Sequence, residues 1–231
     1  MLEAVDKGIW IAEGECVNFH GFPYPTRCVV VRLNDGPLWV WSPIRLTESL
    51  KGEIDRIGKP EYLVSPNKIH HLFLQEWASA YPGATMWGPR STIAKRKDLS
   101  FQAPLTDDPP DAWRSEIDQV WFNGSVAMDE IVFFHRASRT VIMADLSENF
   151  SEAFLKAHWK PWQRAIARIW RIVEGYGYAP LEWRLSFLNR KATRRTRDAV
   201  LGWNPERVIM AHGEWQRSNA RAYLERAFAW M

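Results

Sequence analysis

The first part of the chain has the alternating apolar and polar pattern that is typical of β-strands. Ile9–Glu13, Val17–His20, Cys28–Leu33 and Leu38–Trp41 are the strands that this pattern predicts. The Asn34-Asp35-Gly36 sequence predicts a tight turn between the last two, because asparagine, aspartate and glycine tolerate the backbone angles that hairpin turns need. The chain therefore opens with a predicted run of paired strands.

The middle of the chain alternates short apolar strands with amphipathic segments. Thr47 to Ile57 is amphipathic and ends at Gly58, which predicts one helix, and His70–Ala80 predicts a second. The strands that we expect here share a short, continuous apolar run: Tyr62–Val64, Ala84–Trp87, Gln119–Phe122, Glu130–His135 and Thr140–Ala144.

Helical periodicity dominates from Ser151 onward, although Pro161 is expected to kink or divide that region. Lys191–Leu201 predicts a further helix, Arg207–Ala211 a last buried strand, and Trp215–Trp230 a last helix. This order of strands, strand–helix alternation and helices favours a layered α/β domain over a helical bundle or an all-β sandwich. We expect one domain over residues 1–231.

Composition and charge narrow the class of protein. Hydrophobic residues make up 46% of the 231 residues and charged residues 25%, which fits a globular protein with a real core. No apolar run reaches the roughly 18–20 residues of a transmembrane segment, and the first ten residues lack a signal core, so the expected location is the cytoplasm. Cys16 and Cys28 could pair across a hairpin, but two reduced, packed thiols fit that location better. A net charge of +3 is too small to indicate a nucleic-acid partner.

Histidines and a carboxylate follow the ends of three predicted strands. His70 and His71 come after Tyr62–Val64, Asp145 ends another buried strand, and His212 follows the last one. Taken singly, each is explained by a helix cap, a surface residue or a turn. Together they form a nitrogen and oxygen ligand set suited to zinc, iron or manganese, and α/β folds gather ligands at strand ends. The combination favours a metal site.

Over nearly its whole length, the chain resembles the metallo-β-lactamase superfamily, and more closely a bacterial family of unknown function that is a divergent branch of it. Val29–Leu33 is similar to part of the opening strands, and Trp41-Ser42-Pro43 stands where Asp-Thr-Gly is common. Ala144-Asp145 resembles the superfamily's Gly-Asp, and Ala211-His212-Gly213 resembles its closing Gly-His-Gly. The resemblance implies an α/β fold of four layers, an αββα sandwich.

The superfamily's signature T-H-x-H-x-D-H falls on the segment that ends at His71, and this chain departs from it. With Ser65 in place of the threonine, Pro66 and Lys68 stand where the first two histidines are expected. The mid-chain histidine is also missing, since residues 123–128 contain none. The resemblance therefore implies that the first of the two usual metal sites is lost, which argues against a dinuclear zinc hydrolase.

The second site is different, because all of its positions hold residues that can bind a metal. The resemblance places His70, His71, Asp145 and His212 there. It thus implies at most one divalent metal ion, with Asp145 and His71 as the candidate catalytic residues.

Four cationic or titratable residues are candidates for binding a small-molecule ligand, including an anionic one. Lys68 would lie near the vacated first site, and His135 and Arg139 share a hairpin from which an arginine can grip a carboxylate or phosphate. Arg90, after Gly88-Pro89, could face the same cleft. A plain polar turn and an exposed helix start explain the hairpin residues and Arg90 equally well.

Two functions stay open at this point. One is a mononuclear metallohydrolase that acts on a small ester, phosphoester or lactone. The other is a metal-free, non-catalytic ligand-binding or regulatory module on the same fold, in which the same four side chains form a buried hydrogen-bond network.

Overall fold

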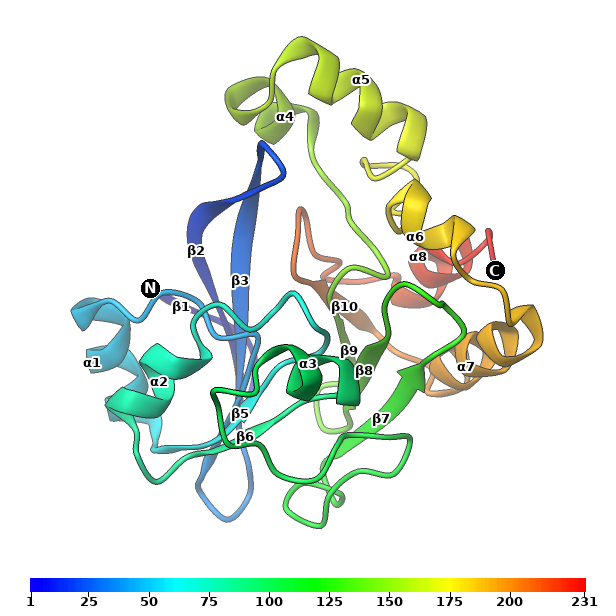
Figure 1. Cartoon of the computed structure of the whole chain (residues 1–231). Coiled ribbons are helices and arrows are strands. Elements are labelled where there is room, and N and C mark those ends of the chain that lie inside the picture. Colours follow the sequence, from blue (N-terminus) through cyan, green and yellow to red (C-terminus); the bar gives the residue numbers. More distant parts are fainter.

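A six-stranded sheet forms the N-terminal half of the protein. The computed structural model describes residues 1–231, and the strands follow one another in sequence order (Figure 1). They are β1 (Leu2–Asp6), β2 (Ile9–Phe19), β3 (Phe22–Arg32), β4 (Leu38–Trp41), β5 (Pro60–Val64) and β6 (Thr85–Trp87). Strands β1 to β4 pair antiparallel, whereas β4, β5 and β6 pair parallel.

A four-stranded sheet from the second half faces the first. Its order is β10 (Arg207–Met210), β9 (Thr140–Met143), β8 (Glu130–His135) and β7 (Ile117–Phe122). Only β9 and β10 pair parallel. Because parallel strands run in the same direction, their carboxyl ends meet at one edge of the sheet.

Helices cover the outer faces of both sheets (Figure 1). The first sheet carries α1 (Glu48–Ile57) and α2 (Leu74–Ala80), and α3 (Arg90–Lys95) follows β6. The second carries α6 (Leu181–Leu185), α7 (Arg190–Gly202) and α8 (Ala220–Ala227). The remaining pair, α4 (Glu152–His158) and α5 (Pro161–Trp170), sits over the tip of the β2–β3 hairpin.

The alternation of side chains along each strand explains this layering. In β3, Val29 and Val31 point into the core between the sheets, where they join Phe133 and Ile142 of the second sheet. Val30, on the opposite face of β3, packs in the cluster that contains residues of α1 and α2. Helix, sheet, sheet and helix therefore form four layers, and the predicted αββα sandwich is confirmed.

Some element boundaries differ from the prediction for local reasons. Strand β2 is continuous where two strands were expected, because its pairing with β3 resumes after a bulge between Gly14 and Val17. Helix α2 begins only at Leu74, because residues 68–73 form turns in which the N–H of Leu74 donates to the carbonyl of His71, three residues before it. Helix α8 begins at Ala220, because Gln216 forms a bridge with β10.

The cysteines are free thiols, as the sequence indicated. Cys28 is buried, but Cys16 is exposed instead of packed, at the bulge between Gly14 and Val17 of β2. None of the helices combines the length and the apolar character needed to cross a bilayer.

Candidate metal centre

Strand register brings the candidate ligands to one edge of the two sheets. The parallel pairing of β9 with β10 places Met143 opposite Met210, so Asp145 and His212, each two residues further on, lie side by side. The parallel pairing of β4 with β5 likewise leaves Ser42 next to the segment that leads to His70. All of these side chains follow the carboxyl ends of strands.

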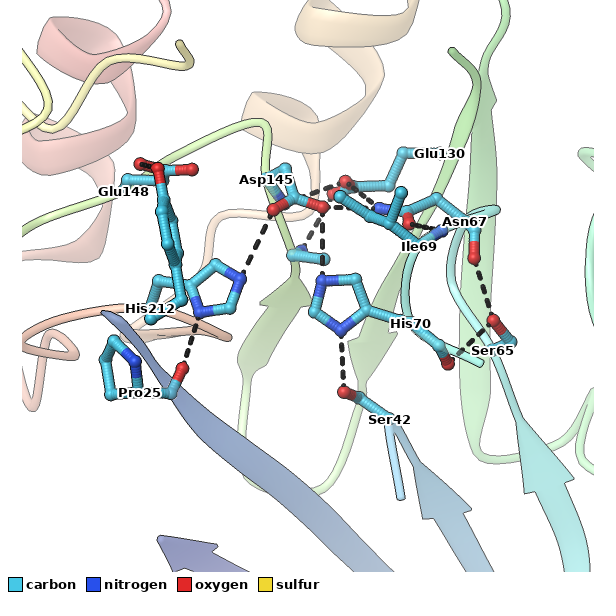
Figure 2. Close-up of polar contacts among 12 residues, drawn as sticks. Pro25, Ser42, Ser65, Asn67, Ile69, His70, Glu130, Asp145, Glu148 and His212 are labelled. Carbon is cyan, nitrogen blue, oxygen red and sulfur yellow. Dashed lines mark hydrogen bonds and ion pairs between the residues drawn. The ribbon is translucent and has the colours of Figure 1, made fainter. Parts of the chain in front are cut away.

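His70, Asp145 and His212 form a compact group (Figure 2). One ligand atom from each lies within 4.8 Å of the others. Nε2 of His70 is 3.1 Å from Oδ2 of Asp145, and Nε2 of His212 is 3.3 Å from Oδ1 of the same carboxylate. The three side chains are only 9%, 4% and 8% exposed, respectively. Two imidazoles and a carboxylate therefore converge in a largely dry pocket.

The orientation of the His212 ring indicates that the three-residue group can bind a cation. Its Nδ1 donates a hydrogen bond to the carbonyl of Pro25 at 2.7 Å, so the proton of the neutral ring is on Nδ1. The lone pair on Nε2 then faces a carboxylate oxygen of Asp145. Two acceptors in that position need a proton or a cation between them. A ring that donates to a backbone carbonyl and turns its other nitrogen inward is typical of metal-binding histidines.

His70 has a comparable partner on its outer nitrogen. Its Nδ1 lies 2.8 Å from the Ser42 hydroxyl, and Ser42 has a left-handed backbone with a φ of 48°. When Nδ1 carries the proton and donates it to Ser42, Nε2 is left free for a cation. The His70 ring, like the His212 ring, can therefore turn an unprotonated Nε2 toward a cation.

Asp145 is held by a buried polar cluster behind it. The Asn67 amide donates to Asp145 Oδ2 at 2.7 Å and to Glu130 Oε2 at 3.0 Å. Glu130, which is fully buried, also accepts the backbone N–H groups of Ala144 and Asp145 at 2.8 and 2.9 Å. The sequence pattern did not single out Glu130, because an acid at the start of a strand is ordinarily solvated.

The charges of this cluster favour an ionised Asp145. Burial by itself would raise the pKa of Asp145, but His70 and His212 outweigh it and hold that pKa well below its usual range. Burial and the Asp145 charge raise the pKa of Glu130 to about 8. The ionised carboxylate of the pair therefore faces the two imidazoles.

The structure does not bring His71 to this group. Nδ1 of His71 lies 3.2 Å from a guanidinium nitrogen of Arg96, which also donates to the His71 carbonyl at 3.1 Å. Burial, followed by the charges of Lys95 and Arg96, lowers the pKa of His71 to about 4. The two imidazoles diverge because they lie in turns before α2, where successive side chains point in different directions. His71 lines the neighbouring cavity instead.

That cavity opens beside the three-residue group and has a volume of about 480 Å³. Lys68 lines this cavity, and its Nζ donates to the carbonyl of Ala127. Lys95 and Arg27 add positive charge to the same wall.

Arg90, His135 and Arg139 lie outside this cavity, which corrects their expected placement. Arg90 is exposed at the start of α3, which agrees with the alternative interpretation of this residue as an exposed helix start. His135 pairs with Thr140 at the end of β8 that is remote from Asp145, and Arg139 forms an ion pair with Glu206 at 3.1 Å. The β8–β9 hairpin turns at the opposite end of the strands from the ligands, so its residues cannot reach them.

His135 gives a testable pH dependence of stability. Its side chain is buried with Nδ1 2.7 Å from the Ser138 hydroxyl, and burial lowers its pKa from 6.5 to about 4. The unfolded chain therefore takes up the proton first as the pH falls below 6.5. We expect the His135 contribution to be complete above that pH and to decrease by about 2 kcal/mol between pH 7 and pH 5.

Urea unfolding of the wild type and of His135→Asn at both pH values checks this expectation. The difference between pH 7 and pH 5 should shrink by about 2 kcal/mol in the variant, whatever its stability at pH 7. An equal pH dependence in both proteins would contradict the buried, neutral imidazole.

Arg27 and Gly213 fix the loop that carries His212. The sequence motif included Gly213, but no sequence pattern pointed to Arg27. The Arg27 guanidinium is 6% exposed and donates to the carbonyls of Met210 and, at 2.8 Å, Gly213. Gly213 has a φ of 85°, and a Cβ there would collide with the backbone of Asn149. An arginine inside a strand has no recognisable partner in sequence, because its acceptors are backbone carbonyls far along the chain.

A known protein family matches about the N-terminal two thirds of the chain. Residues 8–158 match the family model described as a domain of unknown function, DUF4336. The chain belongs to the DUF4336 family. The DUF4336 match includes His70 and Asp145 but ends before His212. No curated protein matches the chain.

Solved structures show that this DUF4336 protein has the metallo-β-lactamase fold. The DIM-1 metallo-β-lactamase exposed to ceftazidime is 16% identical with a TM-score of 0.66, over 99% of this chain and 94% of that one. A metallo-β-lactamase from Pontibacter korlensis is 14% identical with a TM-score of 0.63, over 100% and 97%. Rubredoxin oxygen:oxidoreductase from Desulfovibrio gigas is 11% identical with a TM-score of 0.67, over 99% and 61%. The fold that the resemblance implied is thereby confirmed.

Proposed function

We propose that this protein is a metal-dependent hydrolase that holds at most one metal ion, at His70, Asp145 and His212. The observation that carries the proposal is the inward-facing Nε2 of His212, fixed by the Pro25 carbonyl and set against the Asp145 carboxylate. Two imidazoles and one carboxylate suit zinc, iron or manganese.

Lys68 supports one ion over two. In the signature alignment it stands where a ligand of the first metal would be, and it lines the cavity next to the three-residue group. An ammonium group there repels a second cation and supplies part of the positive charge that the missing ion would have given.

The substrate that fits best is a small ester, phosphoester or lactone. A bound divalent cation supplies Lewis-acid polarisation of a carbonyl or phosphoryl oxygen and lowers the pKa of water. Pro25 and Ser42 orient the two imidazoles, and Asn67 orients Asp145. Lys68 and Lys95 favour an anionic group on the substrate, and a cavity of about 480 Å³ accommodates a small molecule.

Metal analysis of protein purified without a histidine tag tests the proposal. We expect about one equivalent of zinc, iron or manganese per chain, or one equivalent taken up on dialysis against each metal in turn. Hydrolysis of a panel of p-nitrophenyl esters, phosphodiesters and lactones should stop with a chelator and return with the metal. Less than a tenth of an equivalent under all of these conditions would rule the proposal out.

A metal-free binding module is the second candidate, and one observation favours it. The carboxylate of Asp145 already has partners from Asn67, His70 and His212, which form a connected polar network within the protein. The module would bind an anionic small molecule through Lys68 and Lys95. It predicts no metal uptake and no turnover of the panel, so the same experiment separates the two candidates.

A further inference from the structure

A smaller cavity adjoins the one at the proposed metal site. Its volume is about 220 Å³, and seven of its nine lining residues are hydrophobic. Phe19, Tyr24 and Glu182 line both cavities, so the two are neighbours that share a wall. Only these shared side chains lie between the smaller cavity and the cavity at the proposed metal site.

Aromatic rings from the hairpin and the helices above it form most of the smaller cavity. Phe22 of β3 meets Trp159 edge to face, with the ring centroids 5.0 Å apart, and Trp170 and Ile166 of α5 complete the opposite side. These four side chains are hydrophobic, so they give this part of the cavity an apolar wall.

Two hydrogen bonds hold these walls in place. Trp159 Nε1 donates to the carbonyl of Pro23 at 2.8 Å, and the Gln163 side-chain amide donates to the carbonyl of Gly21 at 3.0 Å. They attach α4 and α5 to the tip of the β2–β3 hairpin (Figure 1). The cavity is thus formed without a ligand, and filling it costs little ordering of the chain.

The smaller cavity is one aromatic ring away from the proposed ligands. The Tyr24 ring lies edge to face with the His212 ring at 5.0 Å between centroids, and the Tyr24 hydroxyl donates to Glu148 at 3.2 Å. Glu148 is therefore engaged within the protein, and Glu182 lies exposed at the rim. Apart from the exposed His20 and Glu182, the side chains that line the cavity are hydrophobic and uncharged, next to the candidate metal centre.

We propose that this cavity is a subsite for a neutral apolar group of the substrate, an alkyl chain of about six carbons or a phenyl ring. The cavity is large enough for such a group, since apolar cavities of about 150 Å³ bind benzene and this one is larger. The subsite rests on the proposed function in one respect only, that the reacting ester group lies at His70, Asp145 and His212. It deepens that function by specifying esters with a medium-length apolar acyl group over acetyl esters.

A series of p-nitrophenyl esters from acetate to dodecanoate tests the subsite on the metal-loaded protein. Each buried methylene should raise kcat/KM about three- to fourfold, which gives about 80- to 250-fold over the four methylenes from acetate to hexanoate, followed by a decline for chains too long for the cavity. A kcat/KM that is independent of chain length would overturn the proposal.

Two substitutions in α5 form a matched pair. Ile166 lines the cavity, whereas Ile169 in the same helix is 70% exposed on the outside. Ile166→Phe should reduce kcat/KM for the hexanoate ester about tenfold or more and leave the acetate ester unchanged, because the larger ring fills the cavity. Ile169→Phe should change neither, and Ile166→Ala should move the optimum to a longer chain. Equal effects of Ile166→Phe and Ile169→Phe on kcat/KM for the hexanoate ester would also overturn the proposed subsite.

Binding of 1-hexanol and 1-propanol by calorimetry separates the subsite from the metal. Both alcohols are neutral and are tested on the metal-free protein. Their binding therefore still tests the subsite if the proposed metal chemistry proves wrong. We expect 1-hexanol to bind the metal-free protein at least tenfold more tightly than 1-propanol, and Ile166→Phe to remove that preference. Tighter binding of butyltrimethylammonium than of 1-hexanol would assign the cavity to a cation and overturn the neutral subsite.

Discussion

Replacing His212 by alanine is expected to weaken metal binding by more than about 100-fold. Even the loss of a group that only orients a ligand costs about 10- to 100-fold in affinity, and His212 would be a ligand itself. Only His70 and Asp145 would remain of the three-residue group. Competition with a chromophoric chelator measures the affinity, and any metal-dependent ester hydrolysis should be lost with it.

The neighbouring imidazole provides the control. His71→Ala removes a side chain that contacts Arg96 and lies outside the three-residue group, so its metal affinity should stay close to that of the wild type. Asp145→Asn, which keeps the shape of the carboxylate, should behave like His212→Ala. Equal losses in the His71 and His212 variants would mean that the site is assembled differently from the structure described above.

Replacing Glu130 by alanine is expected to lower the free energy of unfolding by about 3 kcal/mol. The substitution removes the acceptor of the backbone N–H groups of Ala144 and Asp145 and of one of the two N–H groups of the Asn67 amide, at a fully buried position. Each unsatisfied buried donor costs about 1–3 kcal/mol. Relief of the repulsion between the Glu130 and Asp145 carboxyl groups offsets part of that loss.

Urea unfolding midpoints give the measurement, with an exposed carboxylate as the matched control. Glu116 also accepts hydrogen bonds from a backbone N–H group, that of Asn34, but in an exposed position. Glu116→Ala should therefore cost less than about 1 kcal/mol. Glu130→Gln should fall between the two alanine variants, because its amide keeps one oxygen acceptor and turns an NH₂ group toward a donor. A loss below about 1 kcal/mol for Glu130→Ala would contradict its role as the shared acceptor.

Much of the architecture could be predicted from the order of apolar segments. The layered α/β class follows from that order, and the αββα sandwich was implied by the family resemblance, which also rests on short motifs such as Ala211-His212-Gly213. The parallel pairing of the last strand with β9 was not predicted. Segments with weak or short patterns were missed, as with β1 and α6. Their formation depends on a neighbouring strand or helix that lies elsewhere in the chain.

The candidate site was predictable only in part. His70, Asp145 and His212 could be named because each follows a buried strand, and parallel register then brings such positions together. His71, one residue from a true member of the group, could not be separated from His70 by sequence, since the direction of each ring depends on the turn before α2 and on Arg96.

By itself, the sequence determined which buried strands are followed by a histidine or an aspartate. It also determined that Pro66 and Lys68 stand where the resembling superfamily has its first two signature histidines. Only the tertiary structure decided which of these groups meet and which nitrogen of His212 faces inward. It also brought Glu130 and the helices α4 and α5 close to the site. The physical reason is that strand-end residues are placed by local periodicity, whereas ring orientation, burial and cavities depend on contacts between residues far apart in the chain.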